Sequence, residues 1–310
     1  MVLFSLLKKT SNMLKYNYVV LSEEVFQMMK KVFFIFICII LFYAIVIGCS
    51  SFAIYSNINM YGSNFDYPDH FDYRIRIIEG NYTNVLSIEF DPGDRQYKQA
   101  VGFNNKGLFA NLQSLPLAYS QNFRMDFAFI QIEIPNLLYN YNNADNCILE
   151  LKNKKLVNLK PFSNHSLIAD KLANAYIVAA GENENKIIEM KDNFIVLTNF
   201  DIKEDLEITS IKCFRYKNIY NKILENMGNF DVDKGFEILS SAFQIPGTQI
   251  SAIFLPDELL VYAAFKGNID KIVEINLNDN KLRTHKGFKD SKEIDLTKNS
   301  VKLVEILGWK

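Results

Sequence analysis

A cysteine and an aspartate have the residue types and spacing for nucleophilic chemistry. Cys49 opens the segment Cys-Ser-Ser-Phe, and Asp66 closes the segment Gly-Ser-Asn-Phe-Asp after a turn-forming stretch at 57–59. A β-hairpin of that length brings Asp66 back beside residue 49. An N-terminal cysteine carries its own base, because an α-amine has a pKa of about 7.7–8.0 and a thiol about 8.5. A carboxylate can hold the ammonium group that forms, so the pair predicts an N-terminal nucleophile that needs no histidine.

Cys49 becomes N-terminal only if the residues before it are removed. A lysine pair precedes an uncharged apolar run from Val32 to Gly48, at the short end for a membrane span and the long end for a signal peptide. We expect 1–48 to be a signal peptide cleaved after the small residue Gly48; an uncleaved membrane anchor is the alternative. Both interpretations predict export to the cell envelope or beyond, with membrane contact only through this segment. Residues 49–310 are then a single domain.

A competing interpretation of the same cysteine is lipidation. Val46-Ile47-Gly48-Cys49 followed by two serines is also typical of a lipoprotein processing site. The sulfur would then carry a lipid and could not act as a nucleophile. The other cysteines of the exported part, Cys147 and Cys213, are interpreted as small buried residues, with a mutual disulfide as the alternative. His165 is interpreted as a structural histidine.

Composition excludes several classes of protein. The chain has 310 residues, a net charge of −1, 49% hydrophobic and 22% charged residues, which is typical of a globular protein and not of a nucleic-acid-binding one. Its four cysteines and three histidines show no metal-binding spacing, and no glycine-rich phosphate motif occurs. We therefore expect no metal, no cofactor and no nucleic-acid partner. A homo-oligomer is left open.

The elements that must position these residues alternate between strands and helices. Apolar stripes predict one helix from Tyr216 to Met227, ended by Gly228, and a second that is capped by Asp231. A third helix is expected from 143 to 152. β-branched and aromatic runs predict strands at 50–56, 73–78, 106–115, 176–181, 186–190, 194–200, 249–255, 258–265 and 271–277. Segment 129–134 is ambiguous, and the charged stretch 286–302 is interpreted as an exposed tail. Strands, helices, then strands predict an α+β fold.

Several segments together resemble one family of enzymes. Besides the two segments around Cys49 and Asp66, they are Val101–Leu108, Leu115–Pro116, His165–Asp170, Thr198–Phe200, Phe214–Tyr216 and Thr248–Ser251. In this order they resemble the choloylglycine hydrolase-like group of N-terminal-nucleophile hydrolases, which includes conjugated bile-salt hydrolases and penicillin V acylases. The resemblance covers roughly residues 49–277, and it implies a four-layer αββα sandwich.

The resemblance also implies roles for individual residues. Cys49 would attack a carbonyl carbon and form a thioester, while Asp66 would lie against the α-amine. Asn199 would donate to the oxyanion, and Arg215 would favour the thiolate. Asn64 would have a structural role.

Two positions depart from the family pattern, and both concern the substrate. Ser63 replaces an arginine of the family, in what we expect to be a loop beside Cys49. Ser114 or Gln113 stands where bile-salt hydrolases have an asparagine. The expected function is hydrolysis of a linear, non-peptide C–N amide in a small molecule, with bile salts as poor substrates. Acyl transfer from the same thioester and an inactive, lipid-anchored binding protein are the alternatives.

Overall fold

The computed structural model describes six stretches of the chain: 48–80, 82–115, 127–158, 163–200, 211 and 213–310. All of them belong to the unit Val46–Lys310. The predicted signal peptide or anchor lies outside the described residues, apart from Gly48. Among the described residues, no helix is long and apolar enough to cross a membrane.

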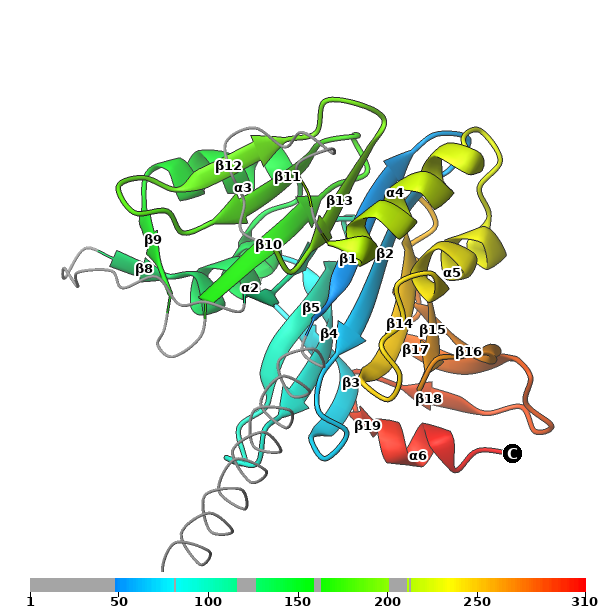
Figure 1. The fold of residues 1–310 in the computed structure, drawn as a ribbon. Coiled ribbons are helices and arrows are strands. Elements are labelled where there is room, and N and C mark those ends of the chain that lie inside the picture. Colours follow the sequence, from blue (N-terminus) through cyan, green and yellow to red (C-terminus); the bar gives the residue numbers. More distant parts are fainter. Residues whose placement is uncertain (1–47, 81, 116–126, 159–162, 201–210, 212) are drawn as a thin grey trace, which may run out of the picture. The chain divides into compact units, whose positions relative to one another are not determined.

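The first sheet has eight strands and carries the site. Its order is β13 (Phe194–Thr198), β1 (Ser50–Tyr55), β2 (Asn59–Asp66), β14 (Thr248–Leu255), β15 (Leu260–Phe265), β16 (Asn268–Asn276), β17 (Lys281–Lys286) and β18 (Glu293–Asp295). Every neighbouring pair is antiparallel (Figure 1). The late strands form the meander that the sequence predicts.

The second sheet has nine strands. Its order is β12 (Lys186–Glu189), β11 (Ala175–Ala179), β10 (Ser163–Ala169), β6 (Phe109–Asn111), β5 (Lys98–Asn104), β4 (Asn84–Asp91), β3 (Asp72–Glu79) and β19 (Val301–Lys302), with β7 (Gln113–Leu115) paired to β10. The strand expected at 106–115 is thus two short strands. It begins late because the Asn104 carboxamide oxygen accepts the N–H groups of Lys106 and Leu108, which forms a turn. A separate parallel pair joins β8 (Phe127–Phe129) and β9 (Lys155–Val157).

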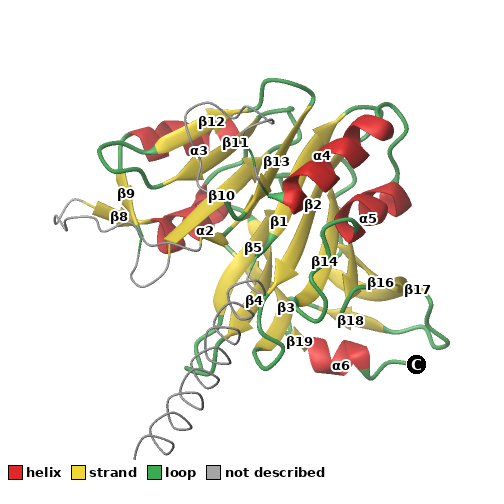
Figure 2. Cartoon of the chain, in the orientation of Figure 1, coloured by secondary structure: helices red, strands yellow, loops and turns green. Residues whose placement is uncertain are grey.

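Helices cover the outer faces of both sheets (Figure 2). They are α2 (Ile130–Asn140) and α3 (Ala144–Lys152) on the second sheet, α4 (Phe214–Glu225) and α5 (Val232–Ser240) on the first, and α6 (Leu303–Leu307) near the C-terminus. One apolar cluster fills the space between the sheets, and one lies beneath each helix pair. The expected four-layer αββα arrangement is therefore confirmed.

Local signals in the sequence account for the helix ends. The side chains of Asn143 and Asp231 accept the backbone N–H groups of the third residue after them, at 2.9 and 2.7 Å. Gly228, with a φ of 82°, follows α4 as expected. Of the ambiguous segment 129–134, Phe129 ends β8 and the other residues belong to α2. Ile130, Ile134, Leu137 and Leu138 form one buried stripe of this helix, although Pro135 lies within it.

One expectation about the remaining segments was wrong. The stretch 286–302 is not an exposed tail: it contains β18 and β19, and Leu296 and Val301 are buried in the core between the sheets. Its charges occupy only the outer side of a paired segment. The interpretation of Cys147 as a small buried residue is confirmed, whereas Cys213 is only partly buried. The alternative, a mutual disulfide, is not formed, because both cysteines are free. Cys147 packs between α3 and the second sheet whereas Cys213 precedes α4 on the first sheet, so the two thiols lie in opposite outer layers.

Candidate active site

Strand register brings the predicted residues around Cys49 together. Ser50 pairs with Asn64 of β2 on one side and with Thr198 of β13 on the other. Gly48 and Cys49 precede this paired stretch, and Gln244 Nε2 donates both to the Gly48 carbonyl and to Asp66 Oδ2. The predicted hairpin is confirmed, and it places the Asp66 carboxylate beside the peptide bond that precedes Cys49.

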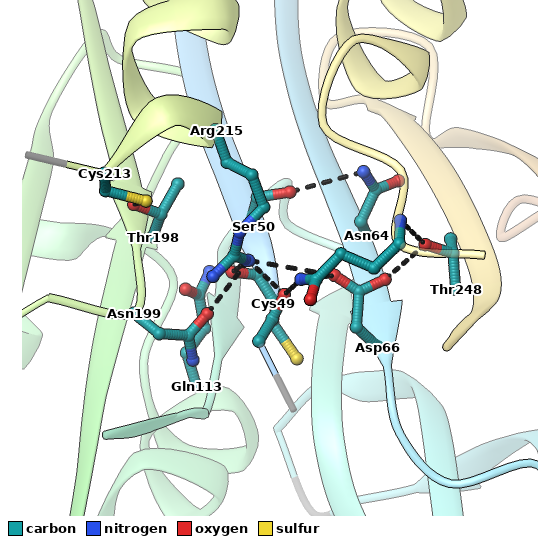
Figure 3. A network of polar contacts seen from close by, with 12 residues as sticks. Cys49, Ser50, Asn64, Asp66, Gln113, Thr198, Asn199, Cys213, Arg215 and Thr248 are labelled. Carbon is teal, nitrogen blue, oxygen red and sulfur yellow. Dashed lines mark hydrogen bonds and ion pairs between the residues drawn. The ribbon is translucent and has the colours of Figure 1, made fainter. Parts of the chain in front are cut away.

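Arg215 joins these strands from the start of α4 (Figure 3). Its Nη1 donates to the carbonyl oxygens of Gly48 and of Cys49, the latter at 2.9 Å, and to Asn199 Oδ1 at 3.2 Å. The same nitrogen lies 3.9 Å from Asp66 Oδ2. A Cβ at position 48 would lie 2.8 Å from Cζ of Arg215, so a larger residue there would displace the guanidinium group. Arg215 thus links the Gly48 carbonyl to Asn199 and Asp66.

Asp66 is buried and held by side-chain donors. Thr248 Oγ1 donates to Oδ1 at 2.5 Å, and Gln244 Nε2 donates to Oδ2 at 3.1 Å. Burial raises the pKa of this carboxyl to about 7, although the Thr248 hydrogen bond and the charge of Arg215 oppose the rise. A carboxyl with that pKa changes its charge near neutral pH, where a catalytic group is most useful.

The Cys49 thiol is buried beside charged groups. Burial raises its pKa to about 12, and the charge of Asp66 adds to this effect. A thiol with such a pKa is protonated at neutral pH, and the thiolate is the nucleophilic form. In these surroundings burial therefore favours the protonated, non-nucleophilic form of the thiol.

Asn199 is oriented at both ends of its carboxamide. Its oxygen accepts from Arg215 at 3.2 Å, and its nitrogen donates to the Ser114 carbonyl. A carboxamide nitrogen has two hydrogens, so a second N–H remains beyond the bond to Ser114. Arg215 thus fixes which end of Asn199 carries the donors.

The supporting residues divide between the two faces of the first sheet. Asn64 donates to the Leu239 carbonyl at 2.8 Å and accepts from Ser251 at 2.8 Å, so it ties β2 to α5. Ser63 is buried opposite Ser51 within β2, so the expectation that it lies in a loop was wrong. The Gly-Ser-Asn-Phe-Asp segment is strand throughout, because it pairs with both β1 and β14.

Gln113 and Ser114, the two candidates for the position where bile-salt hydrolases have an asparagine, have different surroundings. Gln113 is fully buried and donates to the Ser51 hydroxyl at 2.6 Å, which links the two sheets. Ser114 accepts from Asn199 at its carbonyl, and its side chain hydrogen bonds with Tyr67. Ser114 is therefore the one in direct contact with a predicted site residue.

Sequence reasoning missed Gln244, Thr248 and Tyr67 as members of the site. Thr248 stood in a segment of the family resemblance but without a role. Gln244 contacts Asp66 across 178 residues of sequence, in a turn with no motif of its own. Burial is the main cause of the raised pKa of Tyr67, and the charge of Cys49 raises it further. The two side chains are therefore neighbours. No group of three or more potential metal ligands occurs in the described part of the chain.

Solved structures with this arrangement of strands and helices are known. A mutant of the conjugated bile acid hydrolase from Clostridium perfringens matches with a TM-score of 0.60 and 17% identity, covering 78% of this chain and 97% of that one. A penicillin V acylase from Agrobacterium tumefaciens matches with a TM-score of 0.57 and 12% identity, covering 80% and 91%. Both solved structures have the same fold as this chain. This chain has the fold of the N-terminal-nucleophile hydrolases.

A second structure of the Clostridium perfringens enzyme, an arginine-to-leucine variant, matches with a TM-score of 0.57 and 15% identity, covering 78% of this chain and 98% of that one. No family model and no curated protein sequence matches the chain significantly. The resemblance expected from short segments is thus confirmed for the fold. The individual residue roles that it implies remain predictions.

Proposed function

We propose that the chain is a cysteine amidohydrolase of the choloylglycine hydrolase-like group, acting on linear amides through a thioester at Cys49. The observation that carries this proposal is the set of contacts made by Arg215, which donates to the Cys49 carbonyl and to Asn199 Oδ1 and lies 3.9 Å from Asp66 Oδ2. The shared fold with a bile acid hydrolase and a penicillin V acylase supports the same class of reaction.

Activation begins with removal of the residues up to Gly48. The new α-amine accepts the thiol proton, which costs little because the pKa values of the two free groups differ by less than about one unit. The Asp66 carboxylate then holds the ammonium, and Arg215 stabilises the thiolate. The high thiol pKa in the uncleaved chain supports this order of events, since burial without the amine keeps the sulfur protonated.

The thiolate then attacks the carbonyl carbon of the amide. A bond forms between Sγ and that carbon, and the carbonyl oxygen becomes an oxyanion that accepts the second N–H of Asn199. The α-ammonium returns its proton to the leaving amine as the C–N bond breaks. Water, deprotonated by the same α-amine, hydrolyses the thioester and releases the acid. The two hydrogen bonds that join Arg215 to Asn199 and Asn199 to Ser114 support this orientation of the Asn199 carboxamide.

An apolar acyl group fits the surroundings of Cys49. Tyr67 packs against Phe90 and Phe65 at ring-centroid distances of 4.6 and 4.8 Å, and Phe71 stacks on Phe90 at 5.9 Å. Phe71 and Phe90 are only partly buried, so apolar surface remains for a ligand. Ser63 offers no long cation at the position where the family has arginine. We therefore favour simple, uncharged acyl groups over conjugated bile salts.

The burial of Cys49 argues against lipidation. The residue is 3% exposed, whereas a lipid anchor has to extend from its sulfur to a membrane. Export of the chain, with residues 1–48 as its signal, is part of the proposal because it supplies the cleavage that the mechanism requires.

The test is to compare two forms of the protein that differ at one residue. A form that begins at Cys49 and a form that retains Gly48 are produced behind a removable leader, and both are assayed on medium-chain N-acyl amides. We expect amide hydrolysis only from the form that begins at Cys49. Equal activity in both forms would exclude the α-amine as the base.

A further inference from the structure

A short turn at 244–248, just before β14, closes on itself. The backbone N–H of Thr248 donates to the Gln244 carbonyl at 2.8 Å, and the Gln244 N–H donates to the Thr248 hydroxyl oxygen at 2.9 Å. Gln249 donates its side-chain amide to the carbonyls of Pro246 and Gly247, at 3.0 and 3.1 Å. Because the turn is fixed by its own hydrogen bonds, the side chains at its two ends are held in place.

Both of these side chains point at one carboxylate, one to each oxygen. Thr248 donates to Asp66 Oδ1 at 2.5 Å and Gln244 donates to Oδ2 at 3.1 Å, and Figure 3 shows Asp66 facing Thr248. The other charged or titratable groups near Asp66 are Arg215 from α4, the Cys49 thiol and Tyr67. Arg215 is farther away, at 3.9 Å. A fully buried carboxylate depends on such donors, since water does not reach it.

We propose that Gln244 and Thr248 are positioning residues that fix the ionised Asp66 carboxylate beside the junction of Gly48 and Cys49. Gln244 is suited to this role because the same Nε2 donates to Asp66 and, at 2.5 Å, to the Gly48 carbonyl. When Gly48 leaves, the contact with Asp66 remains. The consequence for catalysis rests on the proposed function, in which ionised Asp66 holds the α-ammonium.

Removal of either donor destabilises the ionised carboxylate and raises the pKa of Asp66. Gln244→Met keeps the length of the side chain without its donor, and Thr248→Val keeps the shape without the hydroxyl. Thr248→Ser restores the hydroxyl. We expect the Asp66 titration midpoint to rise by about one pH unit in the first two variants and to stay at the wild-type value in Thr248→Ser.

The measurement is an NMR titration of the full-length chain labelled with ¹³C at aspartate Cγ. The Asp66 signal is assigned by its loss in Asp66→Asn. Gln249→Met is the matched control, because Gln249 is a buried glutamine of β14 next to the turn that bonds to backbone carbonyls and Lys266 and not to Asp66. We expect Gln249→Met to lower the melting temperature and to leave the Asp66 midpoint unchanged.

Enzyme assays then separate this inference from the proposed function. The acid limb of kcat/KM should move to higher pH by the same amount as the NMR midpoint, with KM unchanged. An unshifted midpoint in both Gln244→Met and Thr248→Val would overturn the positioning role while leaving the amidase intact. A shifted midpoint in a protein whose wild type hydrolyses no amide would support the positioning role and refute the proposed function.

Discussion

Two buried cysteines of this protein have opposite surroundings. Cys49 lies at the end of β1 among groups that carry charge or donate hydrogen bonds, namely Asp66, Arg215 and Asn199. Cys147 lies inside α3 among apolar side chains such as Ile134 and Leu151. Burial raises the thiol pKa in both cases, to about 12 at Cys49 and further at Cys147.

The two regions differ in the groups that can oppose the effect of burial on the thiol pKa. Near Cys147 the charge of Asp170 raises the thiol pKa further, and no arginine opposes it. Near Cys49 the charge of Arg215 lowers the pKa, and in the proposed mechanism cleavage after Gly48 would add an α-amine at the same residue. A reactive thiol therefore needs a polar neighbourhood that can change, and burial alone yields an inert cysteine.

The largest expected effect comes from removing the sulfur atom of Cys49. Cys49→Ala should lower kcat by about 10⁴-fold or more, because the thioester can no longer form. It should also abolish the fast iodoacetamide labelling of the processed protein near neutral pH. Cys147→Ala should retain activity, and so should Cys213→Ala. Full activity in Cys49→Ala would show that the nucleophile lies elsewhere.

A smaller loss is expected for the oxyanion donor. Asn199→Ala should lower kcat by about 10²–10³-fold with little change in KM, because the oxyanion exists only along the reaction path. Steady-state kinetics on one amide substrate measure both constants. A change confined to KM would instead assign Asn199 to ground-state binding.

Two buried aspartates extend the comparison to the pH dependence of stability. The pKa of Asp66 is raised to about 7, above its unfolded value, so the folded uncleaved chain binds a proton that the unfolded chain has lost. Asp66 therefore lowers stability as pH rises from about 4 to 7. Asp66→Asn should stabilise the uncleaved chain by about 1–3 kcal/mol at pH 8 and by much less at pH 4.

Asp170 provides the control for this measurement. It is equally buried, but its carboxylate accepts the backbone N–H groups of Ala144, Leu172 and Asn174, at 2.6, 2.8 and 3.2 Å. Asp170→Asn should therefore destabilise the chain at pH 8, by about 1–3 kcal/mol. Urea unfolding at the two pH values gives both results, and a destabilised Asp66→Asn at pH 8 would contradict the account of the site.

The smallest effect concerns the choice of substrate. Because Ser63 cannot replace the donor fork of an arginine, kcat/KM for glycine- and taurine-conjugated bile acids should be about tenfold or more below that for medium-chain N-acyl amides. Phenoxyacetyl amides complete the panel. Bile salts as the best substrates would mean that Ser63 does not determine specificity.

The sequence predicts the parts of this molecule that depend on local pattern. The hairpin from Cys49 to Asp66 follows from strand and turn residues over 50–66, and the helix caps at Asn143 and Asp231 follow from side chains that bond three residues ahead. The contact of Gln244 with Asp66 could not be predicted, because it depends on the pairing of β2 with β14 across the sequence. The burial of Val301 depends in the same way on its pairing with β3.

The most direct test of the central claim is to trap the covalent intermediate. The protein that begins at Cys49 is mixed with a slowly hydrolysed amide, quenched in acid within the first turnover, digested and analysed by mass spectrometry. We predict the mass of the acyl group as a thioester on the peptide that begins at Cys49, and no adduct on the peptides of Cys147 and Cys213. An acyl adduct on another residue, or amide turnover with no adduct on Cys49, would contradict the mechanism.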